Sequence, residues 1–264
     1  MHKNIIYPIL SLLIGTALAG FASYTPDHSN ALPPAPDFVA HAGGAVDGET
    51  YLNTIEALDL NYARGFRFFE LDFSWTSDRV PVGVHDWGQT YKRLFIDHSS
   101  VPNLASFKKQ DMKNGSTPVT FELLDQWLVA HADAWIISDF KNENLNGLRW
   151  IKDNFPDVAD RVIPQIYDPG EYNAVEMLGY QDMILTIYRL PQSADQNMVS
   201  FAQENDLFAL TLPAYRFEQL MLNTDVLNTA MPICVHTIND ADKWLELKDK
   251  GAKCVYTDEL ISDS

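Results

Sequence analysis

The chain has 264 residues, of which 46% are hydrophobic, and a formal net charge of −17 from 36 acidic and 19 basic side chains. A chain of this length buries one large core, so one main domain is the simplest organisation. The acidity excludes the basic stripe that nucleic-acid backbones require and disfavours anionic membranes. We therefore expect a monomer with a small-molecule partner and no nucleic acid; membrane contact is not favoured.

The first residues have the charged, apolar and small-residue regions of a secretory signal peptide. Lys3 precedes an apolar run over residues 5–19, which ends in Ala17-Leu18-Ala19. We expect a signal peptide over 1–19, a linker over 20–36 and the main domain over 37–264. The alternative is an uncleaved anchor over residues 5–24. Both versions export the domain, to the periplasm or the medium.

From residue 37 onward, short apolar runs alternate with amphipathic stretches, a pattern typical of parallel strands joined by helices. Eight runs are rich in β-branched, aromatic and other apolar residues: 38–41, 66–72, 135–139, 162–166, 183–188, 207–211, 233–236 and 254–257. Eight such strands predict an α/β fold, a closed (β/α)8 TIM barrel.

A ninth apolar run, Val80–Val84, lies too close to Asp72 for a helical crossover, which usually needs a dozen or more residues. If the second strand continues through Thr76 and turns at residues 77–79, the ninth run returns antiparallel to it. This hairpin would bring His85 beside Glu70 and Asp72.

Helices fit between the strands. Asn53 is expected to cap a helix over 54–64, and either Asn239 or Asp240 to open a helix that ends at Lys248. A further helix is expected over 121–131. The stretch 87–118 lacks strong periodicity and is expected to be a loop or small insertion over the barrel mouth.

The chain has two cysteines, Cys234 and Cys254, each within an apolar strand-like run. Their number and spacing resemble neither a disulfide scaffold nor a zinc site. We expect buried free thiols, because cysteines on neighbouring parallel strands rarely meet disulfide geometry.

Carboxylates gather at the carboxyl ends of the predicted strands, where barrels place active sites. Glu70 and Asp72 are two residues apart and share one strand face, and Asp139 ends the next strand. Buried like charges repel unless a cation neutralises them. Ligation by oxygen alone predicts one divalent cation, Ca²⁺ or Mg²⁺.

Two histidines, His41 and His85, flank this acidic cluster. Imidazole has an ordinary pKa of about 6.5, so either residue is suited to act as a general acid or base. Three further histidines, His98, His131 and His236, are expected to be structural.

The polar motifs follow one another in a recognisable order: His41-Ala-Gly-Gly, Asn53-Thr-Ile-Glu-Ala57, Phe69-Glu-Leu-Asp72, Thr76-Ser-Asp78, Val80-Pro-Val-Gly-Val-His85-Asp86, Thr117-Pro-Val-Thr-Phe-Glu-Leu-Leu124, Ile137-Ser-Asp139-Phe-Lys141, Val235-His-Thr-Ile-Asn239 and Thr257-Asp258. The set resembles the glycerophosphodiester phosphodiesterase family, in the phosphatidylinositol-phospholipase-C-like phosphodiesterase superfamily. The resemblance covers nearly all of residues 37–260 and implies a barrel of the PLC-like phosphodiesterase type.

The resemblance implies metal-dependent hydrolysis of glycerophosphodiesters to glycerol phosphate and an alcohol, with His41 and His85 as acid and base. It implies that Glu70, Asp72 and Asp139 hold the cation. A substrate hydroxyl next to the ester would attack phosphorus first and form a cyclic phosphate, which water then opens.

Substrate binding is implied for Lys141, at the phosphate, and for Asn53. The sequence departs from the family pattern where Ala42 replaces an arginine, and Arg189 is the candidate substitute. Further departures are Leu52 and Asp139 in place of glutamates and His236 in place of a tryptophan. They bear on the cation and on the pocket for the alcohol.

Two alternatives stay open. A phospholipase C- or D-like enzyme acting on intact lipid would need an apolar rim, for which Trp75, Trp87, Tyr91 and Phe95 are the candidates. A catalytically silent barrel would bind a phosphorylated ligand without turnover.

Overall fold

The computed structural model describes residues 34–205, 207–222 and 231–261. The predicted signal peptide, residues 1–19, and residues 20–33 of the predicted linker lie outside the described residues. Within the described ranges, no helix combines the length and the apolar character that crossing a membrane requires.

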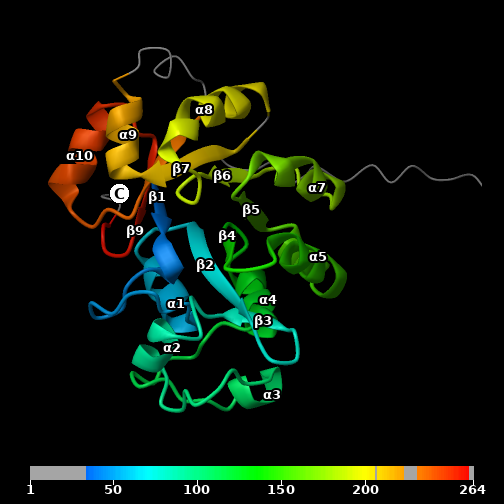
Figure 1. Ribbon diagram of the computed structural model, residues 1–264. Helices are drawn as coiled ribbons and strands as arrows, with labels where there is room; N and C mark the ends of the chain where they lie inside the picture. Colours follow the sequence, from blue (N-terminus) through cyan, green and yellow to red (C-terminus); the bar gives the residue numbers. More distant parts are fainter. Residues whose placement is uncertain (1–33, 206, 223–230, 262–264) are drawn as a thin grey trace, which may run out of the picture. The chain divides into compact units, whose positions relative to one another are not determined.

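Eight parallel strands form a closed barrel (Figure 1). In chain order they are β1 (Phe38–Ala40), β2 (Phe68–Trp75), β4 (Trp135–Phe140), β5 (Val162–Ile166), β6 (Ile184–Thr186), β7 (Ala209–Pro213), β8 (Ile233–His236) and β9 (Cys254–Thr257). Each strand pairs with the next in this order, and β1 pairs with both β2 and β9, which closes the ring. The predicted (β/α)8 TIM barrel is confirmed.

Helices connect the strands and cover the barrel. The α-helices are α1 (Ile55–Ala63), α2 (Gln89–Leu94), α3 (Leu104–Phe107), α4 (Phe121–Ala130), α5 (Asn144–Asn154), α6 (Pro156–Ala159), α7 (Tyr172–Met177), α8 (Asp195–Glu204), α9 (Ala214–Leu220) and α10 (Ala241–Asp249). Short 3-10 helices are η1 (His41–Gly43), η2 (Pro169–Glu171) and η3 (Gln192–Ala194). Outward strand residues such as Leu71 and Val255 pack with helix residues such as Leu124 in one buried core.

The predicted hairpin is confirmed. Strand β3 (Pro81–Gly83) pairs antiparallel with β2, with Phe73 opposite Gly83. The Gly83 amide donates to the Val119 carbonyl at 2.8 Å, and a Cβ atom at Gly83 would lie 2.8 Å from the Cβ of Val119. Only glycine allows this close approach without displacing the segment before α4, so the hairpin is held against the barrel.

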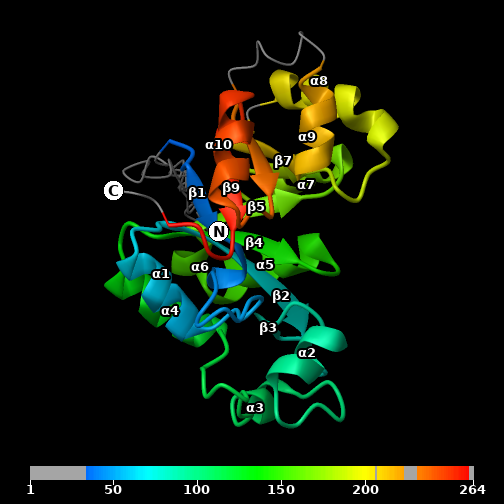
Figure 2. The ribbon, with the colours of Figure 1, turned by 90° about the vertical axis from the view of Figure 1, so that its left-hand side faces the viewer.

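The stretch 87–118 forms an insertion that contains α2 and α3, beside β3 in both views (Figures 1 and 2). It has its own buried cluster, in which Tyr91, Phe95 and Phe107 pack with Leu52 from the loop before α1. Tyr91 and Phe95 are each only 1% exposed. Tyr91 and Phe95 are therefore not available for the apolar rim that an enzyme acting on intact lipid would need.

The N-cap of α1 differs from the prediction. Thr54, not Asn53, is the cap, and its side-chain oxygen accepts a hydrogen bond from the Ala57 amide at 3.3 Å. Asn53 has a positive φ of 51° and its side chain is committed elsewhere, to Asp72. The predicted helix over 121–131 is confirmed as α4, and Asp240 opens α10.

The expectation of two free thiols is wrong. Cys234 on β8 and Cys254 on β9 form a disulfide, because the parallel register places them directly opposite each other with Cα atoms 4.4 Å apart. That separation is at the short end of the disulfide range. The bond links the last two strands of the barrel across 20 residues of sequence.

Breaking this disulfide should lower the free energy of unfolding by about 3 kcal/mol, because a cross-link over 20 residues restricts the unfolded chain. Urea denaturation with and without a phosphine reductant measures the difference. The double variant Cys234→Ala and Cys254→Ala should match the reduced protein and should not respond to the reductant. Equal midpoints for oxidised and reduced protein would contradict the expectation.

Candidate active site

A pocket opens within the barrel, and every barrel strand supplies one polar side chain to its wall. In strand order these residues are His41, which directly follows β1, then Glu70, Asp139, Gln165, Thr186, Thr211, His236 and Tyr256. The cavity holds about 220 Å³, below the ~300–1,000 Å³ typical of pockets for drug-sized ligands. Its size suits a compact substrate.

The three predicted cation ligands come together in one cluster, and two of them, Glu70 and Asp139, line this pocket. Asp72 and Asp139 are paired neighbours in the register of β2 and β4, and Glu70 lies two residues before Asp72 on the same face. One oxygen from each carboxylate lies within 4.8 Å of the others, and all three residues are buried. Strand alternation and register thus produce the cluster that the sequence predicted.

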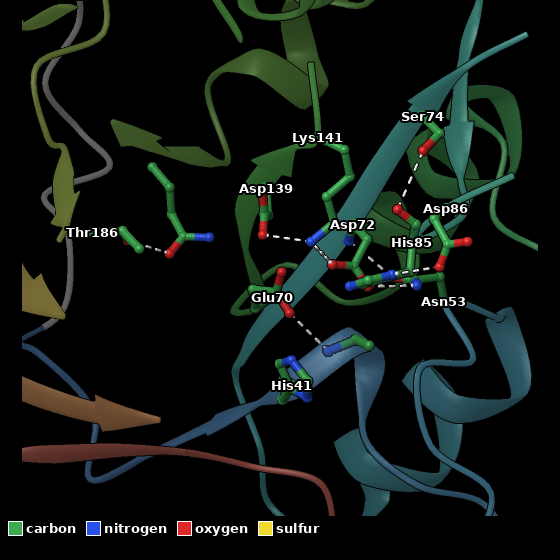
Figure 3. A network of polar contacts seen from close by, with 12 residues as sticks. His41, Asn53, Glu70, Asp72, Ser74, His85, Asp86, Asp139, Lys141 and Thr186 are labelled. Atoms are coloured by element: carbon green, nitrogen blue, oxygen red, sulfur yellow. Dashed lines mark hydrogen bonds and ion pairs between the residues drawn. The ribbon is translucent and has the colours of Figure 1, made fainter. Parts of the chain in front are cut away.

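One ammonium group contacts this cluster directly. The Lys141 ammonium lies 2.5 Å from an Asp72 oxygen and 2.7 Å from an Asp139 oxygen (Figure 3). Burial alone would lower the pKa of Lys141, but the carboxylates of Asp72 and Asp139 raise it above its ordinary value. Burial and the charge of Asp72 raise the pKa of Glu70 to about 8. Three buried carboxylates with one ammonium are a donor set that fits a hard divalent cation.

Two neighbours orient these carboxylates. The Asn53 side chain is fully buried; its Nδ2 donates to Asp72 Oδ2 at 2.9 Å, and its Oδ1 accepts from the Asp72 amide at 2.9 Å. The Ala42 amide donates to Glu70 Oε2 at 2.8 Å. Asn53 therefore supports a predicted cation ligand from behind. The family pattern has an arginine at position 42. In this chain Ala42 contacts the site through its backbone amide, which bonds to Glu70.

His41 is held by a carboxylate that the sequence analysis did not assign. Its Nδ1 lies 2.8 Å from Asp258 Oδ1, and Asn239 Nδ2 donates to the other Asp258 oxygen at 2.8 Å. Burial alone would lower the pKa of His41, but the hydrogen bond to Asp258 and the charges of Glu70 and Asp72 raise it to about 9. His41 is thus a cation at neutral pH in the protein without bound metal.

Asp258→Asn should lower the pKa of His41 and destabilise the metal-free protein by about 1.5–3 kcal/mol at pH 6. A raised histidine pKa stabilises the fold fully below the unfolded value of 6.5, and that contribution is lost as pH rises through about 9. The gap between variant and parent should therefore shrink between pH 6.5 and 9. Thermal unfolding across this range, with NMR titration of the His41 imidazole, measures both effects. A gap that is independent of pH would contradict this assignment.

His85 has a similar arrangement at the hairpin. Its Nδ1 lies 2.9 Å from Asp86 Oδ2, and the other Asp86 oxygen accepts from the Gly88 amide at 2.7 Å. In each histidine the carboxylate occupies Nδ1, which leaves Nε2 for the pocket that both residues line. Asp86 adjoins His85 in sequence and Asp258 directly follows β9, so the positions of these two acids in the sequence could have indicated both partners.

Arg189 lies beside the pocket rather than among its lining residues. Its guanidinium stacks on the Tyr167 ring, 3.6 Å from the ring centre, and one nitrogen lies 3.8 Å from Asp139 Oδ1. The Tyr167 hydroxyl donates to the same Asp139 oxygen. Asp139 has a shorter side chain than the glutamate of the family pattern. The Tyr167 hydroxyl contacts the Asp139 carboxylate.

His236 replaces the tryptophan of the family pattern and does line the pocket. Burial, with the positive charges of His41 and Arg216, lowers its pKa to about 4. It is therefore a neutral imidazole, and its Nε2 has no hydrogen-bond partner among the described residues. The pocket has a charged side on β1, β2 and β4 and an uncharged polar side on β5 to β9.

Comparison with solved structures supports the fold. Two glycerophosphodiester phosphodiesterases from Parabacteroides distasonis superpose with TM-scores of 0.65 (18% identity, 84% of this chain, 92% of that chain) and 0.64 (14% identity, 86% and 84%). The glycerophosphodiester phosphodiesterase from Thermotoga maritima superposes with a TM-score of 0.61 (20% identity, 86% and 96%).

No curated protein is significantly similar to the chain in sequence. The model of the glycerophosphoryl diester phosphodiesterase family, however, matches residues 46–262, which is most of the chain. The matched range contains His85, Asp86 and Asp258 and begins after His41. The chain therefore belongs to the glycerophosphoryl diester phosphodiesterase family and is a phosphoric diester hydrolase.

Proposed function

We propose that the protein hydrolyses glycerophosphodiesters to glycerol phosphate and an alcohol, with one divalent cation, Ca²⁺ or Mg²⁺, and with His41 and His85 as acid and base. One observation carries this proposal. Two histidines, each with Nδ1 on a carboxylate, line the same small pocket as Glu70 and Asp139, which belong to a buried cluster of three carboxylates.

The hydrogen bond between His41 Nδ1 and Asp258 suits His41 to the role of general acid, because the carboxylate stabilises the protonated imidazole. His85 then takes the role of base. In the first step, His85 Nε2 accepts the proton of a substrate hydroxyl next to the ester as that oxygen bonds to phosphorus. The bond from phosphorus to the leaving alcohol breaks, and His41 Nε2 protonates the departing oxygen, so a cyclic phosphate and a free alcohol result.

In the second step the roles reverse. His41, now neutral, accepts a proton from water, the water oxygen bonds to phosphorus and the ring opens, with His85 returning its proton to the ring oxygen. A cation held by Glu70, Asp72 and Asp139 would supply positive charge to the phosphate oxygens as negative charge develops there. Lys141, already within 2.7 Å of two of these carboxylates, is the second source of positive charge.

We also propose that the barrel acts after export, to the periplasm or the medium, and as a monomer. The disulfide between Cys234 and Cys254 supports export, because disulfides persist in oxidising compartments and are rare in reducing ones.

The test uses residues 20–264 with a panel of glycerophosphodiesters, bis(p-nitrophenyl) phosphate and lipid vesicles. Phosphorus NMR follows the products with chelator and after Ca²⁺ or Mg²⁺ is added back. Glycerol phosphate formed only with a cation, preceded by a cyclic phosphate signal, is the expected result. Turnover of vesicles alone would favour the phospholipase alternative. Inactivity towards every diester, with and without cation, would favour the silent barrel.

A further inference from the structure

Tyr51 lies between the two histidines of the site. Its ring centre is 4.8 Å from that of His41, at an interplanar angle of 81°, and 4.9 Å from that of His85, at 78°. Tyr51 lines the pocket together with both imidazoles. One aromatic ring thus makes an edge contact with each of the two groups that the proposed reaction requires.

The backbone around Tyr51 is fixed on both sides. Its φ of 59° is a left-handed conformation that is rare for tyrosine and persists only where surrounding contacts impose it. The carbonyl of Thr50 accepts a hydrogen bond from Arg93 of α2 at 2.7 Å. Leu52 is 2% exposed in the core of the insertion, and Asn53 is bonded to Asp72. The contacts of the neighbouring residues, rather than the conformational preference of tyrosine, therefore fix the position of the Tyr51 ring.

These contacts also account for a departure from the family pattern. Leu52 stands where that pattern has a glutamate, and it contributes apolar packing to the insertion. Glu49 does not replace that glutamate at the site, because its carboxylate accepts a hydrogen bond from Asn114 at 2.8 Å on the exposed surface. The loop before α1 is thus anchored to the insertion, and Tyr51 is the residue that it presents to the pocket.

We propose that Tyr51 is a positioning residue that sets the orientation of both imidazoles. A hydrogen bond at Nδ1 fixes one atom of each ring but allows the ring to tilt about that contact. A rigid aromatic edge against the ring removes this freedom, since aromatic pairs prefer the perpendicular arrangement seen here. Both Nε2 atoms are then held ready for proton transfer, where misplacement of about 1 Å costs up to about 100-fold in rate.

The ring, rather than the hydroxyl, carries this role. Burial and the charges of Asp258 and Asp72 raise the pKa of Tyr51, so the hydroxyl stays protonated. Tyr51→Phe keeps the ring and removes the hydroxyl. Tyr51→Leu keeps apolar bulk and removes the flat edge, and Tyr215→Leu is the matched control on α9, at a tyrosine that is 60% exposed.

The inference rests on the proposed function, so the experiment has two readouts. In the first, Tyr51→Leu should lower kcat by about 10- to 100-fold with little change in KM, while Tyr51→Phe stays within about threefold of the parent. In the second, ¹⁵N relaxation of the His41 and His85 imidazoles, with signals assigned by their absence from the alanine variants, should show increased ring motion in Tyr51→Leu and unchanged motion in Tyr51→Phe. Tyr215→Leu should change neither readout.

The outcomes separate the two ideas. If the parent protein turns over no diester, the proposed function fails, while the relaxation measurement still tests the positioning of the rings. If the parent is active and Tyr51→Leu keeps both kcat and the ring motion of the two imidazoles, the positioning role is wrong. Equal losses in Tyr51→Phe and Tyr51→Leu would also overturn it, because they would assign the effect to the hydroxyl. If Tyr51→Leu does not fold, a change in imidazole ring motion in Tyr51→Phe would still overturn the proposal, because it would assign the effect to the hydroxyl.

Discussion

Replacing His41 with alanine should lower kcat by about 10²- to 10⁴-fold, the usual contribution of a positioned acid or base. His85→Ala should have a loss of similar size, because each histidine handles one proton in each step and neither can take over for the other. The fold should survive both changes, since each side chain lies at a pocket wall rather than in the apolar core. Steady-state turnover of the best diester in the panel measures the effect.

His98→Ala is the matched control, because His98 lies on the exposed surface of the insertion, outside the pocket. The double variant of His41 and His85 should lose little more than either single variant, since the two residues act as one unit. Additive losses would show that the two histidines act independently. A His41→Ala variant that keeps more than about a tenth of the parent activity would remove His41 from the mechanism.

Asp72→Asn should abolish both turnover and the stabilisation that a divalent cation gives. A cation at about 100 times its dissociation constant contributes about 2.7 kcal/mol, which raises the melting temperature of a domain of this size by about 5–10 °C. Asn keeps the shape of the side chain but removes one of three negative charges from the cluster. Thermal melting with Ca²⁺, Mg²⁺ or chelator measures this without any substrate.

Asp47→Asn provides the comparison, because Asp47 is exposed and asparagine tolerates its positive φ of 51°. It should respond to cations like the parent. A cation-induced rise in melting temperature that persists in Asp72→Asn would place the cation elsewhere, and turnover that is insensitive to chelator would remove the cation from the reaction.

The barrel, the hairpin and the acidic cluster were predictable from the sequence for a common reason. They depend on local rules: strand alternation puts Glu70 and Asp72 on one face, and the short spacing before Val80 allows only an antiparallel return. Register then brings Asp139 beside Asp72 without further information, because neighbouring parallel strands end at the same mouth.

Other features depend on how distant segments meet. The disulfide follows from the register of β8 and β9, and no local pattern around Cys234 or Cys254 reports it. The place of Tyr51 depends on a left-handed loop that packs on the insertion, and neither strand nor helix periodicity applies to such a loop. Asn53 was assigned to substrate binding, whereas its buried contacts are with Asp72.

The bond between Cys234 and Cys254 also gives this protein a chemical dependence on its surroundings. Where thiols are kept reduced, the chain folds without this disulfide. The folded chain then unfolds more often, and proteases cleave the unfolded form. The same chain in an oxidising space becomes the longer-lived form. Retention of this bond, and with it the lifetime of the folded chain, therefore depends on the redox state of its surroundings.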